Sequence, residues 1–329
     1  MAPETLPRLV SVVIPCFRGE RFLAKAVESC LGQAYPLIEI IVVDDASPDS
    51  CAAIAERYAL ADGRVRVVRR PSNGGVSRAF NSGYEVARGE YFTRLAQDDT
   101  FEPDAIARLV AGLRAGGPGT GLAYCDYCRI DEAGSDLGGA ITAEPLDALK
   151  YRNEIGLCVM WTREVWEAIG GFDPEFDAAE DFEYWLRAAE RFSFVKCSGP
   201  PALRVRMHSA MGTIQFADQQ RAAYHNALVH RARTGRFKLD RRWAERQIAA
   251  ARVHQTWGDC SGYRKSYGQA LAYTLLSLAE WPLPFPGYAR VGKPSCSRAR
   301  MLISYSARIL CSVPGWIPDL VRALRRRMA

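Results

Sequence analysis

Residues 91–99 read YFTRLAQDD, and they decide how the rest of the chain is interpreted. An apolar, β-prone run ends here in two adjacent carboxylates, Asp98 and Asp99, and the chain is expected to turn into a helix after Pro103. Ligands of open α/β sheets bind at the carboxyl ends of the strands. Two acids at such a point can hold a hard divalent cation that neutralises a pyrophosphate, although an isolated Asp-Asp pair is also a common surface turn.

The sequence before this stretch alternates between strand and helix patterns. Four segments read as strands, at 9–15, 38–43, 64–68 and 90–95. Three segments between them have the apolar spacing of helices, at about 20–31, 49–60 and 75–87, with Asp49 as a cap for the second. This order predicts an α/β fold with a mostly parallel, Rossmann-like sheet and helices on both faces.

The pattern changes after residue 100. A strand is expected at 122–129, a hairpin turn at 131–134 and a loop at 138–144. A short helix at 161–169 is expected to stop at Gly170, and Asp177 with Glu180 forms a variant capping box for a helix reaching about residue 190. Two short strands are expected near Phe194 and at 203–207, and the chain beyond 217 reads as helical.

Charge divides the chain unevenly. Residues 1–217 contain 23 Lys and Arg against 31 Asp and Glu, residues 218–281 contain 11 against 5, and residues 282–329 contain 9 against 1. An acidic front joined to a basic rear suggests separate tasks. We therefore expect a catalytic domain at 1–216, a helical extension at 217–281 and a basic amphipathic tail at 282–329.

The tail combines apolar and basic side chains. A Pro-rich break at 282–286 precedes the amphipathic segment 301–311, and three arginines follow at 325–327. Such a segment suits a peripheral anchor on an anionic membrane surface, and it equally suits a helix docked on the protein's own core. Nucleic-acid binding is not expected, because no recognition motif accompanies the charge.

Other features point to the cytoplasm, with association at the inner face of the membrane as the peripheral alternative. The N-terminal residues show no secretory signal, and no apolar run approaches the length of a membrane span. The ten cysteines are scattered through apolar segments, which suits a reducing compartment. Cys125 and Cys128 form a lone C-x-x-C without a second pair at zinc spacing, and are expected to be structural.

The first strand excludes two common nucleotide-binding classes. The residues that follow it, Pro15 to Glu20, contain a single glycine, whereas a dinucleotide-binding fold needs G-x-G-x-x-G there. The phosphate loop G-x-x-x-x-G-K-S/T is also absent from the sequence. Acids instead end two strands, as Asp44-Asp45 and as Asp98-Asp99.

These blocks together resemble the family 2 glycosyltransferases of the GT-A fold. The matching text is SVVIPCFRGE at 11–20, IIVVDDASPD at 40–49, NGGVSRAFNSGYEVARGEYFTRLAQDD at 73–99, GGFDPEF at 170–176, AEDFEYWLRAA at 179–189 and RVRMHSAM at 204–211. The resemblance covers roughly residues 8–215. It implies an inverting hexosyl transfer from a nucleotide-sugar donor, expected to be UDP-linked, to a glycan or lipid-linked acceptor in polysaccharide biosynthesis.

The resemblance assigns a donor site and a metal site. Asp45 would accept hydrogen bonds from the base, beside a wall made by Pro15 and Phe17. Glu20 and Arg78 would also lie in the donor site.

Asp98 would contact the ribose or sugar, and Asp99 and His208 would hold Mn²⁺ or Mg²⁺. Such a metal acts as a Lewis acid that stabilises the departing diphosphate.

The same resemblance makes Asp181 the catalytic base. A sugar hydroxyl is a weak nucleophile and gains from a positioned carboxylate that takes its proton. Trp185 lies one helical turn from Asp181 and could stack on a sugar ring. Glu180 and Trp161 are the other residues assigned to contacts with the acceptor or sugar.

Two departures from the family pattern leave alternatives open. The family usually has Asn where Arg18 stands, and often has another Asp where Gln97 stands. Both departures fit a nucleotide-sugar-binding module without turnover. The presence of Asp45, Asp99 and Asp181 together argues against this alternative. A nucleotidyltransferase is a further alternative, but that class needs a glycine-rich basic loop after the first strand.

Overall fold

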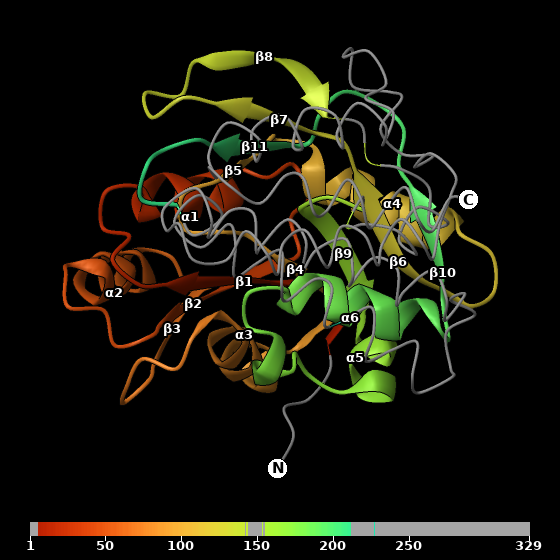
Figure 1. The fold of residues 1–329 in the computed structure, drawn as a ribbon, viewed down its shortest axis with the longest axis horizontal. Coiled ribbons are helices and arrows are strands. Elements are labelled where there is room, and N and C mark those ends of the chain that lie inside the picture. Colours follow the sequence, from red (N-terminus) through yellow and green to blue (C-terminus); the bar gives the residue numbers. More distant parts are fainter. Residues whose placement is uncertain (1–5, 142, 144–152, 154, 212–226, 228–329) are drawn as a thin grey trace, which may run out of the picture. The chain divides into compact units, whose positions relative to one another are not determined.

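The computed structural model describes residues 6–141, 143, 153, 155–211 and 227 (Figure 1). The chain divides into two compact units, at 1–244 and 245–329, and every described residue belongs to the first. The expected tail at 282–329 and nearly all of the expected helical extension lie outside the described residues. Among the residues that are described, no helix is both long and apolar enough to cross a bilayer.

A seven-stranded sheet forms the centre of the described unit, in the order β10-β6-β9-β4-β1-β2-β3. Its strands are β1 (Leu6–Cys16), β2 (Ile38–Asp44), β3 (Val65–Arg69), β4 (Gly89–Arg94), β6 (Thr120–Cys125), β9 (Cys158–Thr162) and β10 (Ser193–Lys196). Strand β1 pairs in parallel with both β2 and β4, and only β9 runs antiparallel to its neighbours. The expected mostly parallel sheet is confirmed.

A second sheet of four strands lies beyond the first, in the order β5-β11-β7-β8. Its members are β5 (Thr100–Phe101), β7 (Tyr127–Ile130), β8 (Asp136–Ile141) and β11 (Leu203–Arg206). Because β5 follows β4 closely in the chain and pairs with β11, it brings the segment after Arg206 near the end of β4.

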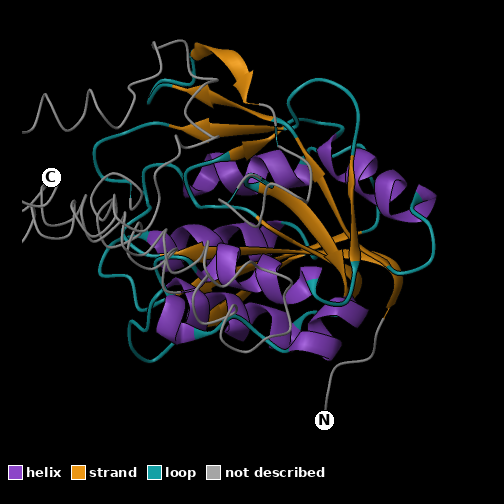
Figure 2. Cartoon of the chain, turned by 45° about the vertical axis from the view of Figure 1, so that its right-hand side comes forward, coloured by secondary structure: helices purple, strands orange, loops and turns teal. Residues whose placement is uncertain are grey.

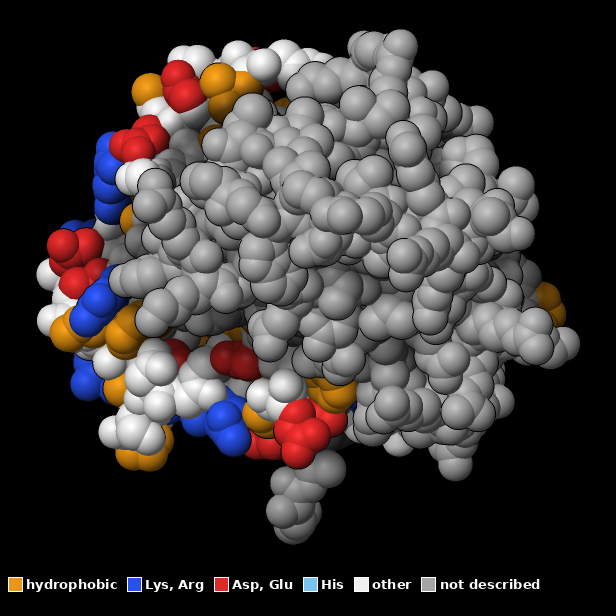
Figure 3. Space-filling model, in the orientation of Figure 1, with side chains coloured by type: hydrophobic (Ala, Val, Ile, Leu, Met, Phe, Trp, Pro, Cys, Tyr) orange, Lys and Arg blue, Asp and Glu red, His pale blue; other side chains and the backbone are white. Residues whose placement is uncertain are grey.

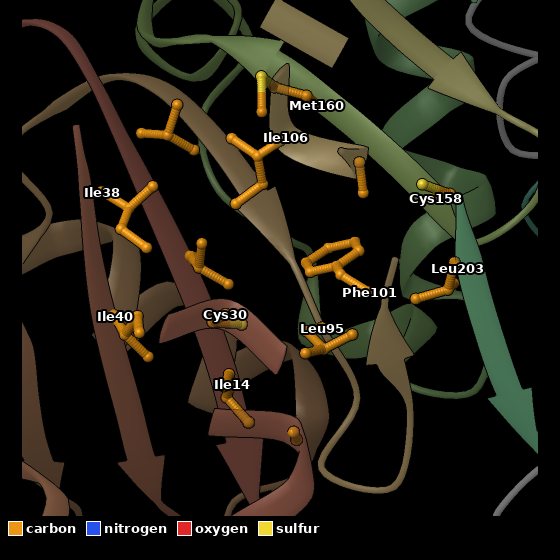
Figure 4. Packing of buried hydrophobic residues seen from close by; sticks show 14 of the residues in the cluster. Ile14, Cys30, Ile38, Ile40, Leu95, Phe101, Ile106, Cys158, Met160 and Leu203 are labelled. Atoms are coloured by element: carbon orange, nitrogen blue, oxygen red, sulfur yellow. The ribbon is translucent and has the colours of Figure 1, made fainter. Parts of the chain in front are cut away.

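Helices cover both faces of the large sheet (Figure 2). They are α1 (Leu23–Leu31), α2 (Cys51–Ala61), α3 (Val76–Val86), α4 (Ala105–Ala115), α5 (Arg163–Ile169) and α6 (Glu180–Ala189), with a 3₁₀ turn, η2, at Pro174–Phe176. Val12 and Ile14 of β1 belong to the core cluster under α1, α2 and α4, part of which Figure 4 shows. Val13 belongs to the opposite cluster with α3, α5 and α6, as the two-residue period of a strand requires.

The structure corrects the expected strand at 122–129. Two strands, β6 and β7, occupy this stretch and belong to different sheets. The break is at Asp126, whose carboxylate pairs with Lys196 (2.9 Å) and accepts a hydrogen bond from Ala143 N (2.9 Å). These partners are distant in sequence, so local hydropathy does not reveal the break. The expected hairpin turn at 131–134 is confirmed. The loop predicted at 138–144 is wrong over residues 138–141, which belong to β8 (Asp136–Ile141).

Two expected helix starts were also wrong. Trp161 lies in β9, and α5 begins after Thr162, whose side chain accepts a hydrogen bond from Val165 N. The capping box at the start of α6 is not formed, because Ala179 occupies the N-cap position. The Asp177 carboxylate instead accepts from Ser77 N (2.8 Å) and so caps α3.

Acidic and basic side chains are interspersed on the described part of the surface in Figure 3. Several form ion pairs along β3 and α2, such as Arg69 with Glu56 (2.6 Å) and Arg64 with Asp62 (2.8 Å). Exposed pairs of this kind contribute little to stability, so packing of the apolar clusters holds the sheet and helices together.

Gly83 provides a test of how closely α3 packs on the sheet. A Cβ at this position would lie 2.4 Å from Val13 Cγ1 and 3.0 Å from Val43 Cγ2. Gly83→Ala should lower the free energy of unfolding by about 1–3 kcal/mol through overpacking, measured by urea denaturation. Glu85→Ala, at an exposed position of the same helix, is the control and should stay within about 0.5 kcal/mol of wild type. Equal stability of Gly83→Ala and wild type would contradict this packing.

Candidate active site

The end of β1 is where the sheet opens. Val13 O accepts a hydrogen bond from Leu95 N, so the main-chain groups of Val13 and Pro15 both face β4. Pro15 has no N–H to continue this ladder, whereas pairing with β2 continues to Cys16 and Asp44. The chain also reverses its order of strand addition here, from β2 and β3 on one side to β4 on the other. A parallel sheet binds ligands at such a point.

The residues after β1 form one rim of this opening. Phe17 is 36% exposed, and the Arg18 guanidinium lies 5.2 Å from its ring centroid. An exposed aromatic face at this edge is suited to stacking against a base. The Glu20 carboxylate is turned towards α2, because it accepts a hydrogen bond from Ser50 N (2.9 Å) at the start of that helix.

Asp45 follows β2 and is 3% exposed. Its carboxylate accepts hydrogen bonds from Gly74 N (3.1 Å) and Gly75 N (3.0 Å), and Arg70 pairs with it. Arg78 donates to Gly74 O (3.1 Å) and so lies near the same loop. The structure therefore gathers Asp45 and Arg78 at one place, and adds Arg70, which sequence reasoning missed.

Asp98 and His208 meet although they are far apart in sequence. His208 Nε2 lies 2.8 Å from Asp98 Oδ2, and both side chains are mostly buried. Pairing of β5 with β11 explains the approach, since the first follows Asp98 and the second precedes His208. The ring of Phe22, with its centroid 5.1 Å from that of the imidazole, packs beside His208.

Asp99 is held differently from Asp98. It is 5% exposed, and its Oδ1 accepts a hydrogen bond from Arg206 N (2.8 Å). Burial raises the pKa of Asp99 well above its usual range, and the neighbouring Asp98 charge raises it further, against the opposing effect of the Arg206 hydrogen bond. The Arg206 side chain donates to Asp98 O (3.0 Å) and to carbonyls of the β7–β8 turn, which braces this end of β4.

These residues fit a divalent metal only in part. Among the described residues, no group of three or more His, Cys, Asp and Glu is arranged as a metal site. Asp98 and His208 nevertheless supply a carboxylate and an imidazole within 2.8 Å of each other. Mg²⁺ is commonly held by one or two protein ligands together with substrate phosphates, so a two-residue site is chemically adequate. His208 was expected to act with Asp99, and the structure brings it to Asp98.

Asp181 lies at the N-terminus of α6, beside Glu180. Arg94 at the end of β4 faces both acids, with Nη1 at 3.3 Å from Glu180 Oε1 and 3.9 Å from Asp181 Oδ2. Asn153 donates to Asp181 Oδ2 (2.9 Å), and Asp181 Oδ1 accepts from Phe182 N (2.7 Å). Arg94 thus ties the candidate catalytic base to the end of β4, the strand that precedes Asp98.

Trp161 and Trp185 are core residues. Their exposed fractions are 0% and 1%, and their ring centroids lie 5.4 Å apart in an edge-to-face arrangement. Each ring also packs against Tyr184. Neither ring presents a face for stacking on a sugar, so the structure contradicts their expected contact with the acceptor.

The residues that sequence reasoning missed are mostly partners of the expected acids. They are Arg70, Arg94, Gln97, Asn153 and Arg206. A charged residue inside an apolar strand was an available signal for Arg94, because such a side chain must find a partner when buried. The others depend on contacts between distant loops.

The raised pKa of Glu180 provides a test of the buried pair formed by Glu180 and Asp181. Burial raises it, and the Asp181 charge raises it further against the effect of Arg94, from 4.5 to about 8. The folded protein therefore holds this proton more tightly than the unfolded chain, and stability is lost as pH rises from about 4.5 towards about 8.

Glu180→Gln removes this titration. The melting temperature of the variant relative to wild type should therefore rise between about pH 5 and about pH 8, measured by differential scanning fluorimetry. Glu175→Gln, in the exposed η2 turn, is the control and should show no such trend. A relative melting temperature of Glu180→Gln that is constant or falls with pH would show that Glu180 stays ionised beside Arg94.

The chain is similar in sequence to a known family and to several known proteins. Residues 11–136 match the family described as Glycosyl transferase family 2. An uncharacterized glycosyltransferase of Rickettsia typhi is 28% identical over 289 residues, covering 83% of this chain and 87% of that protein. An uncharacterized protein of Sinorhizobium fredii is 33% identical over 186 residues, and the match spans 56% of this chain but only 20% of that relative's length.

Two solved structures share the fold. One is TarS 1-349 of S. aureus in complex with UDP-GlcNAc, with a TM-score of 0.58, 14% identity and coverage of 83% of this chain and 80% of that chain. The other is the mannosyltransferase PcManGT from Pyrobaculum calidifontis in complex with GDP-Man and Mn²⁺, with a TM-score of 0.56, 18% identity and coverage of 94% and 83%. The fold is of the GT-A glycosyltransferase type.

Proposed function

We propose, from the match of residues 11–136 to glycosyltransferase family 2, that this chain transfers a hexosyl group from a nucleotide-sugar donor to an acceptor hydroxyl, with inversion at the anomeric carbon. The observation that carries the proposal is that three acidic groups follow, or are linked to, the carboxyl ends of strands in one sheet. These groups are Asp45 after β2, the Asp98–His208 pair after β4 and Asp181, which Arg94 links to the end of β4.

The donor would lie across the opening between β1 and β4. Its base would enter beside Pro15 and Phe17 and compete with Arg70 for Asp45, whose carboxylate can accept from a base N–H. The related folds were solved with UDP-GlcNAc and with GDP-Man, which supports a nucleotide sugar in this chain. We propose a UDP-linked donor as the first to be tested.

Asp98 and His208 would hold Mn²⁺ or Mg²⁺ beside the donor diphosphate. A bound cation acts there as a Lewis acid and stabilises charge on the departing group. Asp99 has one carboxylate oxygen committed to Arg206 N, so its proposed part at the metal is to place Asp98. The neighbour solved with Mn²⁺ supports a metal-assisted reaction.

Asp181 would accept the proton of the acceptor hydroxyl as that oxygen attacks the anomeric carbon. Asn153 and the Phe182 N–H fix the orientation of its carboxylate, and Arg94 Nη1 lies 3.9 Å from its Oδ2. Attack from the side opposite the diphosphate inverts the anomeric carbon. Glu180 shares Arg94 with the catalytic base and is kept as the proposed contact with the acceptor.

The acceptor is proposed to be a glycan or a lipid-linked glycan. A location at the inner face of the membrane would follow if the basic segment 282–329 binds anionic lipid, since it carries 9 Lys and Arg against 1 acid. In the alternative, a binding module without turnover, the donor site would be intact but Asp181 would have no catalytic role.

Asp181→Asn separates these alternatives. The variant should bind donor as wild type does, because the amide keeps the shape of the side chain, but transfer should fall by about 10²–10⁴-fold through loss of the base. A thermal-shift screen of nucleotide sugars with Mn²⁺ identifies the donor, and release of nucleoside diphosphate measures turnover.

Asp104→Asn is a matched control, since Asp104 is also at the start of a helix but 53% of its side chain is exposed. Its turnover should equal that of wild type. Near wild-type turnover in Asp181→Asn would remove Asp181 from the mechanism.

A further inference from the structure

The loop after β1 is held by side chains at every residue. Four successive backbone N–H groups each donate to a side chain from another segment: Phe17 to Gln97 Oε1 (2.9 Å), Arg18 to Ser47 Oγ (2.7 Å), Gly19 to Cys51 Sγ (3.2 Å) and Glu20 to Asp49 Oδ2 (3.0 Å). Arg18 has a φ of 54°, a left-handed conformation that is uncommon for a residue with a side chain. The loop is therefore fixed in a conformation that its own sequence does not favour.

Three of these four acceptors come from one stretch of chain: Ser47 and Asp49 lie between β2 and α2, and Cys51 is the first residue of α2. Gln97 is the one that comes from the segment after β4, immediately before Asp98. It makes a second bond to the same residue, because its Nε2 donates to Phe17 O (3.0 Å). The side-chain amide of Gln97 thus pairs with both main-chain groups of Phe17 and links the two rims of the opening.

Only an amide of this length satisfies both groups. A carboxylate can accept from Phe17 N but cannot donate to Phe17 O, and Asp is also one methylene shorter. The fit is close, since a Cβ on Gly19 would lie 2.0 Å from Gln97 Oε1. Both polar atoms of the Gln97 amide are hydrogen-bonded to the main chain of Phe17. The side chain is therefore committed to the loop after β1 and not to a metal.

We propose that Gln97 is a positioning residue that holds the Phe17 wall at a fixed separation from Asp98, and that it takes no part in metal binding. The inference rests on the proposed function, in which the nucleobase of the donor lies by Phe17 and its diphosphate lies by Asp98. A donor spans both groups, so fixing their separation beforehand removes part of the ordering cost of binding. Where the family often has an acid that could bind a metal, this chain therefore has an amide that supports the binding site of the nucleobase.

The test uses the full chain with Gln97→Ala and Gln97→Glu, the latter keeping size and acceptor while losing the donor group. Calorimetry measures the affinity of uridine diphosphate or guanosine diphosphate, whichever wild type binds, and of the matching nucleoside, together with that of Mn²⁺. Both Gln97 variants should weaken the nucleoside and the diphosphate by the same factor, about tenfold, and leave Mn²⁺ affinity unchanged. His208→Ala should show the opposite pattern.

Hydrogen exchange gives a readout that does not depend on any ligand. Exchange at the Phe17 amide should accelerate in Gln97→Ala and stay at the wild-type rate in His208→Ala. Loss of Mn²⁺ affinity in the Gln97 variants, or unchanged exchange at Phe17, would overturn the proposal. If wild type binds neither diphosphate, the proposed function fails, and the exchange measurement still decides whether Gln97 holds the loop.

Discussion

The pairing of β1 with two parallel neighbours orders the rest of the described structure. Both β2 and β4 end at the same edge as β1, so the acids that follow them are brought to one side of the sheet. Pro15 then stops the ladder towards β4 while the ladder towards β2 continues. The acidic groups therefore follow the strands on either side of the point where β1 and β4 stop pairing.

Collecting acids in this way has an electrostatic cost. Five carboxylates of the site, Asp45, Asp98, Asp99, Glu180 and Asp181, are mostly buried, and an unpaired buried charge is unfavourable. Each has a compensating group: Arg70 for Asp45, His208 for Asp98, the Arg206 N–H for Asp99 and Arg94 for the pair on α6. A cation brought in beside the diphosphate would add to this compensation, which is a physical reason for the donor and metal to bind together.

The sequence predicted the elements whose patterns are local. Continuous Val and Ile runs predicted β1 and β2, and the apolar stripe from Phe22 predicted α1. The adjacent acids marked the strand ends that carry Asp45 and Asp98. What was missed depends on contacts between distant segments, such as the break at Asp126 and the capping of α3 by Asp177.

The site shows the same limit. Periodicity could not separate Trp161 in a buried strand from Trp161 at the start of a helix, because a short apolar run fits both. Nor could it pair His208 with Asp98 in preference to Asp99, since that choice is made by the pairing of β5 with β11. The sequence pattern presents Gln97 only as the loss of an acid, whereas the structure shows that its amide makes two hydrogen bonds to Phe17.

The proposed function depends on Asp98 and His208 as the metal side of a nucleotide-sugar site. Calorimetric titration of uridine diphosphate into wild type and His208→Ala, each with Mn²⁺ and with a chelator, tests it directly. The account predicts that chelation weakens binding to wild type by about tenfold or more, and that His208→Ala binds equally weakly in both conditions. Binding to wild type that is independent of Mn²⁺, or a His208→Ala variant that keeps the full Mn²⁺ effect, would contradict it.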